Sequence, residues 1–141
     1  VALVARLKAR RPDLAVGADL IAGFPTEDDA AHGANLSIAA ELGIVHGHVF
    51  PYSQRPGTPA ARMPQVPRQA IKARAAELRA AIAAQRDHWL RRLVGQPQEV
   101  LAERDGTGHA PNFARVRLPA GTKAGTIVRV TPTRIVEGLL E

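Results

Sequence analysis

Two loops carry residues whose types and spacing could do chemistry, and each follows an apolar run typical of a strand. The first spans residues 23–27, Gly-Phe-Pro-Thr-Glu, at the start of a predicted helix. Free N–H groups at a helix N-terminus can receive a carboxylate or a phosphate, so this loop is a candidate anion site. Taken alone, its sequence favours the plainer interpretation of a tight strand-to-helix turn with acidic residues in the first helical turn.

The second loop spans residues 51–59 and places Tyr52, Ser53, Arg55 and Thr58 among prolines and a glycine. Proline fixes the backbone and glycine permits a ligand to approach closely. A rigid polar loop after a strand predicts a binding loop. The alternative is a linker that simply leaves the preceding fold.

Three polar residues lie inside the predicted strands. His46 and His48 flank Gly47 at a spacing that can ligate a metal, but no third ligand accompanies them, which favours structural histidines. Asp19 interrupts an apolar run, either as a functional carboxylate facing a barrel lumen or as the partner of a neighbouring group. We assign no catalytic residue and no metal ligand in this chain.

The elements that position these loops follow from hydrophobic spacing. Residues 1–11 predict a helix ended by Pro12, and residues 15–22 predict a buried strand. Thr26, with Asp29 three residues later, predicts the cap of a helix that runs to Leu42, where Gly43 ends it. Residues 44–50 predict a second strand. Strand, helix and strand in this order form a βαβ unit with parallel strands.

The second half changes character. Residues 51–67 hold too many prolines for a regular element, and a long helix follows from Arg68 to Leu93. Short runs at residues 99–103, 113–118, 125–131 and 136–140 predict a small antiparallel barrel. We expect Trp89 and Phe113 to lie in its core, although barrels of this kind also use aromatic residues on nucleic acid. The helical spacing predicts one apolar stripe, made of Ile71, Ala75, Leu78, Ile82, Trp89 and Leu93.

Composition sets the outer limits. The 141 residues carry a net charge of +6 and no cysteine, which excludes disulfides, a thiolate nucleophile and a cysteine-ligated metal. Residues 62–93 hold eight basic and two acidic residues, so this helical region supplies the surplus. Such a stripe fits a polyanion such as nucleic acid as well as it fits a solvated helix face. No run is long and apolar enough to span a bilayer, so we expect no membrane contact and a cytoplasmic location. Because Val1 already lies in a helical pattern, we expect the chain to begin inside a larger protein.

A family resemblance joins the two loops. Residues 19–27, Asp-Leu-Ile-Ala-Gly-Phe-Pro-Thr-Glu, and residues 48–61, His-Val-Phe-Pro-Tyr-Ser-Gln-Arg-Pro-Gly-Thr-Pro-Ala-Ala, resemble the last two βα units of the radical S-adenosylmethionine (SAM) methylthiotransferases. The form of the second stretch most resembles the branch that acts on N6-threonylcarbamoyladenosine in tRNA. Residues 94–141 resemble the TRAM domain, the small RNA-binding barrel of these enzymes. The chain departs from the family pattern at Thr26 and His32, and in having no cysteine.

The resemblance implies radical chemistry by two 4Fe-4S clusters and SAM, with the clusters bound by cysteines outside this chain. It implies that Ile21 and Gly23 lie near the adenine of SAM and that Phe50, Pro51 and Tyr52 contribute backbone contacts. The expected partners are a tRNA anticodon stem-loop and the N-terminal domains of the same polypeptide. Phosphate contacts require placed cations, and the candidates in the helix and the barrel are Lys72, Arg79, Arg86, Arg115, Arg117, Lys123, Arg129 and Arg134.

The expected α/β architecture has three parts. Residues 1–62 form the end of a partial (β/α) radical SAM barrel, residues 63–93 a basic linker helix, and residues 94–141 an OB-like antiparallel TRAM barrel. The parent enzyme would form the 2-methylthio derivative of threonylcarbamoyladenosine, with the present chain inactive alone. The alternatives are an RNA-binding module only, or a methylthiotransferase for a ribosomal protein or for isopentenyladenosine in tRNA. Residues 1–61 leave a sheet edge unpaired, so we expect them to aggregate when made alone.

Overall fold

The computed structural model describes residues 1–141, which divide into two compact units. One unit comprises Val1–Pro12 and Val16–Gln85, and the other comprises Asp13–Ala15 and Arg86–Glu141. We call them the N-terminal unit and the C-terminal unit. The long helix α3 (Arg68–Leu93) begins in the first unit and ends in the second. None of the helices combines the length and the apolar composition that a bilayer crossing requires.

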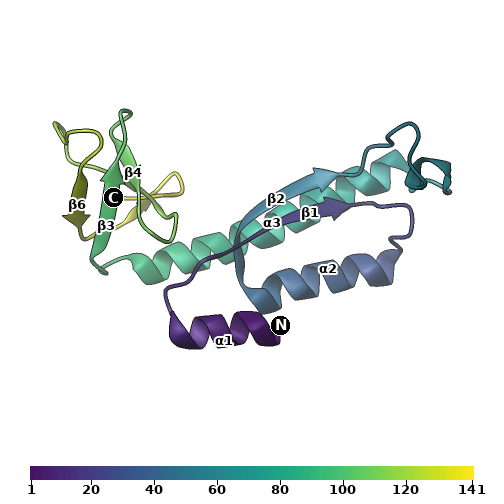
Figure 1. Ribbon diagram of the computed structural model, residues 1–141, viewed down its shortest axis with the longest axis horizontal. Helices are drawn as coiled ribbons and strands as arrows, with labels where there is room; N and C mark the ends of the chain where they lie inside the picture. The colour runs from purple at the N-terminus through teal and green to yellow at the C-terminus, as the bar shows by residue number, and fades with distance from the viewer. The chain divides into compact units, whose positions relative to one another are not determined.

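The N-terminal unit is built on a βαβ motif. Strands β1 (Val16–Ala22) and β2 (Ile44–Pro51) pair in parallel, and α2 (Asp29–Leu42) connects them, as the sequence predicts (Figure 1). Helix α1 (Ala2–Arg10) precedes β1, and a short 3-10 helix, η1 (Ala60–Arg62), lies between β2 and α3. The long predicted helix is confirmed, because α3 spans Arg68–Leu93.

The cap of α2 differs from the prediction. Asp28, not Thr26, caps the helix, and its carboxylate accepts from the N–H of Ala31 at 2.8 Å. Residues 24–27 form a turn instead, in which the N–H of Glu27 donates to the carbonyl of Phe24. The helix therefore begins two residues later than the capping pattern suggests. Gly43 ends it in the left-handed conformation, as predicted.

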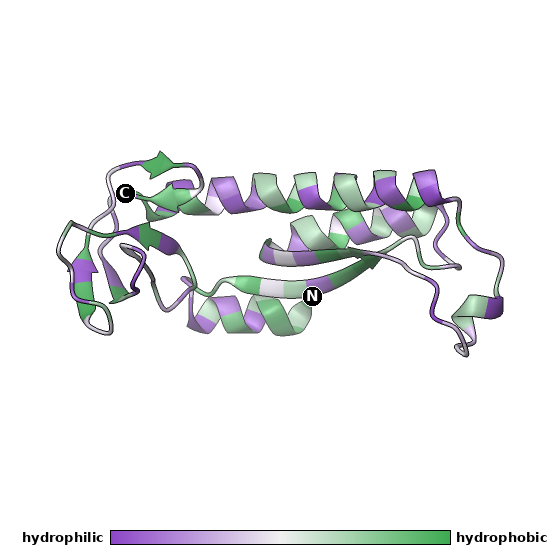
Figure 2. Ribbon diagram, turned by 90° about the horizontal axis from the view of Figure 1, so that it is seen from above, coloured by the Kyte–Doolittle hydropathy of each residue, from purple (hydrophilic) through white to green (hydrophobic).

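One face of the β1–β2 sheet packs against α2 and α3. Its core is formed by small and aliphatic side chains: Ala22, Ala39, Ile44, Val49, Ala75, Leu78 and Ile82. Ile44 and Val49 are an odd number of residues apart, so in a regular strand their side chains would point to opposite faces. They share this face because the register shifts by one residue between Val16 and Gly17. Figure 2 shows α3 alternating between hydrophobic and hydrophilic bands along its length, as expected for a helix with one packed side.

Two glycines let α3 approach the sheet closely. A Cβ atom on Gly23 would lie 2.6 Å from Cγ1 of Ile71, and one on Gly47 would collide with the end of Ile82. Gly23 also adopts a φ of +79°, which disfavours any residue with a side chain. The glycine of the first loop is therefore required by helix packing as well as by the turn.

The C-terminal unit contains a six-stranded sheet in the order β6-β3-β4-β5-β8-β7. The strands are β3 (Gln98–Ala102), β4 (Thr107–His109), β5 (Arg115–Arg117), β6 (Ile127–Val130), β7 (Ile135–Val136) and β8 (Leu139–Leu140). Most pairs are antiparallel, as predicted, but β5 and β8 pair in parallel. The turn at Glu137 and Gly138 splits the last predicted strand in two, and β7 pairs back on β8.

Two predictions for this unit are wrong. Strand β4 was missed, because Thr107-Gly108-His109 has the composition of a turn. Gly108 is needed there, since a Cβ atom would collide with the carbonyl of Leu101 on the neighbouring strand. Phe113 is not in the core: its side chain is 69% exposed, and β5 begins two residues later at Arg115. Trp89 is buried at 5% exposure, as predicted.

Candidate functional site

The uncovered face of the β1–β2 sheet holds two of the predicted cofactor contacts. Ile21 and Phe50 are register partners on neighbouring strands, and they are 54% and 52% exposed. Because paired residues of adjacent strands point to the same face, they form one apolar surface. The ring of His48 stacks on Phe50 with centroids 6.5 Å apart, and His48 is in turn the register partner of Asp19. A flat apolar surface beside polar groups suits the face of a purine.

Gly23 and Tyr52 lie at the ends of the same strands, but their surroundings differ. Gly23 packs over Ile71 of α3, and the Tyr52 ring packs edge-on against Phe24 at 5.4 Å. The N–H of Tyr52 donates to the carbonyl of Ala22 at 2.8 Å, which continues the pairing of the strands beyond β2. The structure therefore separates the five predicted residues into an open face and a helix-packed end.

A pocket of about 650 Å³ opens beside this end of the sheet. It brings together residues that the sequence assigned to two different roles, Pro51 and Tyr52 for the cofactor and Lys72 and Arg79 for RNA. Its other lining residues are Ser53, Gln54, Gln65, Val66, Arg68 and Ile71, so three cations and no carboxylate line it. The hydroxyl of Tyr52 is buried without a hydrogen-bond partner. The pocket therefore presents positive charge and favours an anionic ligand.

A buried carboxylate fixes the first loop. Glu27 is 8% exposed, and its Oε2 accepts from the N–H of Gly23 at 3.1 Å and from the amide of Asn35 at 3.3 Å. The carboxylate of Asp28 accepts a hydrogen bond from the N–H of Ala31. The loop's own carboxylates thus occupy N–H groups that an external anion would need. This arrangement supports the structural interpretation of residues 23–27 over the anion-site interpretation.

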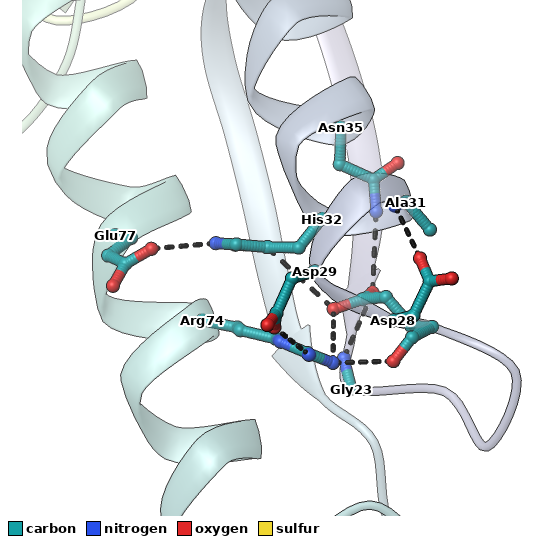
Figure 3. A network of polar contacts seen from close by, with 9 residues as sticks. Gly23, Asp28, Asp29, Ala31, His32, Asn35, Arg74 and Glu77 are labelled. Carbon is teal, nitrogen blue, oxygen red and sulfur yellow. Dashed lines mark hydrogen bonds and ion pairs between the residues drawn. The ribbon is translucent and has the colours of Figure 1, made fainter.

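Helix α3 reaches into the same network (Figure 3). Arg74 donates to the carbonyl of Glu27 at 2.6 Å, contacts its carboxylate at 3.3 Å and pairs with Asp29 at 2.7 Å. Nε2 of His32 lies 2.7 Å from the carboxylate of Glu77, which accepts a hydrogen bond from the imidazole. The loop after β1 is therefore tied to α3 by charged hydrogen bonds. Sequence reasoning missed Arg74 and Glu77, since nothing local connects them with a loop so far upstream.

The predicted RNA contacts fall into four groups. Arg79 donates to the carbonyl of Val49 at 2.9 Å, so part of its guanidinium is already used inside the N-terminal unit. Three arginines pair with carboxylates of the C-terminal unit: Arg115 with Asp105, and both Arg117 and Arg134 with Glu141. Arg86 is half-buried. The remaining three, Lys72, Lys123 and Arg129, are exposed and form no ion pair.

Asp105 holds the turn between β3 and β4. Its Oδ1 accepts from the hydroxyl and the N–H of Thr107 at 2.6 and 3.0 Å, and its Oδ2 pairs with Arg115 at 2.6 Å. The hydroxyl and N–H of Thr107, with a smaller contribution from Arg115, lower the pKa of Asp105 below its ordinary value. The carboxylate therefore stays ionised at neutral pH and keeps Arg115 in place.

The structure shows no group of three or more His, Cys, Asp and Glu side chains that could hold a metal ion. His46 and His48 lie on β2, where their register partners are Gly17 and Asp19. The expectation that these histidines are structural stays a prediction.

Comparisons with known proteins connect these features with an enzyme family. No family model matches the chain. The chain is 40% identical over 136 residues to the threonylcarbamoyladenosine tRNA methylthiotransferase MtaB of Rickettsia prowazekii, covering 96% of this chain and 32% of the relative. It is 36% identical over 138 residues to the tRNA-2-methylthio-N(6)-dimethylallyladenosine synthase of Cereibacter sphaeroides, covering 93% and 32%.

A further relative with the same name as the second, from Erythrobacter litoralis, is 37% identical over 135 residues, which are 91% of this chain and 30% of the relative. The chain therefore spans about a third of the length of the curated relatives it matches. Both names describe enzymes that modify tRNA, and the similarity runs through both structural units. Over the part that it matches, the chain belongs to the tRNA methylthiotransferase family.

Proposed function

We propose that this chain belongs to a radical SAM tRNA methylthiotransferase that acts on N6-threonylcarbamoyladenosine. In that enzyme it forms the SAM-facing end of the barrel and the RNA-binding surface, which we call the RNA grip. The observation that carries the proposal is the open sheet face of Ile21 and Phe50 beside a pocket lined by three cations. The apolar sheet face suits a purine cofactor, and the cationic pocket suits a polyanionic substrate. The 40% identity to a relative named for threonylcarbamoyladenosine supports this branch of the family.

The residues of the open face fit SAM. Ile21 and Phe50 offer apolar surface to the adenine. Where β2 ends, Pro51 and Tyr52 offer carbonyl oxygens to its edge, because proline has no N–H and the N–H of Tyr52 donates to Ala22. Gly23 contributes through the backbone of the turn, because its α-carbon packs against Ile71 of α3. When bound, SAM supplies the radical and the methyl group, while these residues orient it and exclude water from one side.

The residues of this chain do not fit an iron–sulfur cluster. The sequence contains no cysteine, and no cluster of His, Cys, Asp and Glu side chains could hold a metal ion. We therefore assign both clusters to other parts of the parent polypeptide, and with them the sulfur insertion. On this proposal the present chain binds and positions but does not catalyse alone, and the parent works in the cytoplasm, where tRNA is modified.

Nucleoside analysis of tRNA tests the substrate. In a strain lacking the parent gene, the 2-methylthio form of threonylcarbamoyladenosine should be absent, and N6-threonylcarbamoyladenosine without the methylthio group should accumulate. Loss of the 2-methylthio dimethylallyl nucleoside instead would favour the second branch, which the 36% and 37% relatives support. Persistence of both nucleosides would reject tRNA as the substrate and favour a ribosomal protein.

Binding of unmodified tRNA to this chain across a salt series tests the RNA grip. We expect binding that weakens steeply as salt rises, because lysine and arginine contacts to phosphate release counterions. Lys72→Gln and Arg129→Gln should each reduce the salt slope by about one. Asp87→Asn, which removes an exposed carboxylate beside Arg91, is the control and should not weaken binding. No binding at low salt would reject the grip.

A further inference from the structure

Phe113 has an unusual combination of conformation and exposure. Its φ is +62°, and the only other non-glycine residue with positive φ is Glu137. A bulky side chain in the left-handed region raises the free energy of the fold, and such strain persists where surrounding structure enforces it. Burial does not compensate for the strain here, because the side chain is 69% exposed. The folded state therefore holds an aromatic ring in solvent at an energetic penalty.

The turn around Phe113 enforces this conformation. The N–H of Phe113 donates to the carbonyl of Ala110 at 2.8 Å, and the N–H of Ala110 donates to the carbonyl of Ala114 at 3.0 Å. The side chain of Asn112 accepts from the N–H of Ala114 at 3.1 Å. Ala110 and Ala114 are 4% and 0% exposed, so both ends of the turn are anchored in the core. The ring is consequently presented from a fixed base.

An aromatic neighbour extends the surface. The His109 ring lies 6.4 Å from the Phe113 ring at an angle of 59°, and Nδ1 of His109 lies 2.9 Å from the carboxylate of Glu103. An ionised carboxylate can only accept, so Nδ1 carries the proton and the imidazole orientation is fixed. Two rings are thus held side by side on the surface of the C-terminal unit.

A row of exposed apolar side chains continues from His109 across the sheet. His109 on β4 is the register partner of Leu101 on β3, and Leu101 is the partner of Ile127 on β6. Leu101 and Ile127 are 51% and 72% exposed. With neighbouring strands about 4.8 Å apart, the row from β6 to β4 spans roughly 10 Å. We call Phe113, His109, Leu101 and Ile127 the apolar row.

Cations lie at both ends of the apolar row. Arg129 is two residues beyond Ile127 on the same strand, so both side chains point to the same face. At the other end, Arg115 is the register partner of His109. Each arginine also has a carboxylate beside it, because Arg115 pairs with Asp105 and Glu99 is the register partner of Arg129. The apolar strip therefore carries the complementarity to nucleotides, through the flat faces of their bases.

We propose that the apolar row, with Phe113 as its main contact, is a stacking platform for unpaired bases of an RNA strand. The inference rests on the proposed RNA grip and specifies how it selects its ligand. Bases in a duplex are already stacked on one another and cannot lie on Phe113, whereas unpaired bases can. The apolar row therefore selects single-stranded loops, and Arg129, the exposed arginine beside it without an ion pair, contacts phosphate without regard to sequence.

The test compares variants of the 141-residue chain for binding to an unpaired RNA oligonucleotide, carrying 2-aminopurine, and to a duplex of the same sequence. Phe113→Gly removes the ring and also the left-handed strain. We expect a roughly ten- to hundred-fold weaker affinity for the unpaired strand, unchanged duplex binding and an unchanged salt slope. Phe113→Trp should retain both the affinity and the change in 2-aminopurine fluorescence.

Two variants separate stacking from folding. Phe113→Asn also tolerates the left-handed region, so it should lose affinity while it keeps the thermal midpoint of the wild type. Glu137→Gly makes the same kind of backbone change at the other left-handed residue, and it should not weaken RNA binding. A lower midpoint for both Phe113→Gly and Phe113→Asn would mean that the ring is structural, which would overturn the proposal.

The outcomes also separate this inference from the function beneath it. A wild-type chain that binds neither RNA at low salt would reject the RNA grip, and the stacking platform with it. A wild-type chain that binds, together with Phe113→Gly that binds the unpaired strand equally well, would reject the platform alone. Equal losses for the duplex and the unpaired strand would likewise overturn the selection for unpaired bases.

Discussion

The two faces of the β1–β2 sheet differ in what limits the choice of amino acids on each of them. On the covered face, Ala22, Leu78 and Ala75 are fully buried, and α3 lies so close that Gly23 and Gly47 leave no room for a Cβ atom. On the open face, Ile21 and Phe50 are more than half exposed. Contiguous exposed apolar side chains are typical of surfaces that bind a ligand or a partner. Packing therefore constrains residue choice on the first face, and under our proposal ligand chemistry constrains it on the second.

The largest expected effect is Leu78→Ala on the covered face. Removing this fully buried side chain leaves a cavity and should lower the free energy of unfolding by about 2–5 kcal/mol. Ile21→Ala, on the open face, should lower it by less than about 1 kcal/mol. Chemical denaturation of both variants measures the difference, and equal losses would mean that the two faces are equally packed.

Glu27→Ala tests the link between α3 and the first loop. The variant leaves the N–H of Gly23 without its acceptor and removes one partner of Arg74, so we expect a loss of about 3 kcal/mol in the free energy of unfolding. Asp87→Ala breaks the exposed pair with Arg91 and should lose less than about 0.5 kcal/mol. A Glu27 variant as stable as the Asp87 control would show that the network contributes little to the covered face.

A pair of glycines isolates the close approach of α3. Gly23 and Gly57 have φ of +79° and +85°, but only Gly23 has a neighbour where a Cβ atom would lie. Both alanine variants lose about 1–2 kcal/mol from the left-handed conformation, and Gly23→Ala should lose a further 1–3 kcal/mol, approximately, from overpacking against Ile71. The difference between their thermal unfolding curves gives the packing contribution, and identical curves would exclude it.

The smallest expected effect on stability lies on the open face. Ile21→Thr and Phe50→Ser should change the free energy of unfolding by no more than about 0.5 kcal/mol, because both side chains are more than half exposed and Phe50 loses only its stacking on His48. Light scattering at rising concentration should nevertheless show later aggregation, since the exposed apolar area falls. A clear loss of stability in either variant would mean that this face is packed in solution.

Local patterns predicted those elements whose determinants are local. The apolar runs and Gly43 placed β1, α2 and β2 within a residue or two at most boundaries, and the spacing of Ile71, Leu78 and Ile82 placed α3. The cap of α2 was misplaced because Thr26 fits the capping pattern as well as Asp28 does. Which of the two residues caps the helix depends on the position of Glu27, whose partner Arg74 is 47 residues away.

The candidate site was predictable only in part. The motif residues Ile21 and Phe50 do share an accessible face, but no local signal shows that Tyr52 and Lys72 line one pocket. Strand β4 and the exposure of Phe113 were missed for a common reason. Thr107-Gly108-His109 and Phe113 are defined by neighbouring strands and by backbone angles, and residue type alone would place each of them elsewhere.

The left-handed backbone at position 113 also affects which sequences selection can keep there. If folded yield were the only criterion, Gly or Asn would outcompete Phe at this position, because both adopt that conformation more readily. At Leu78 the native residue is already the one that folding favours. Selection on folding alone would therefore move position 113 away from an aromatic residue and would retain Leu at position 78. Retention of Phe at this position among related chains would then record selection on surface chemistry rather than on stability.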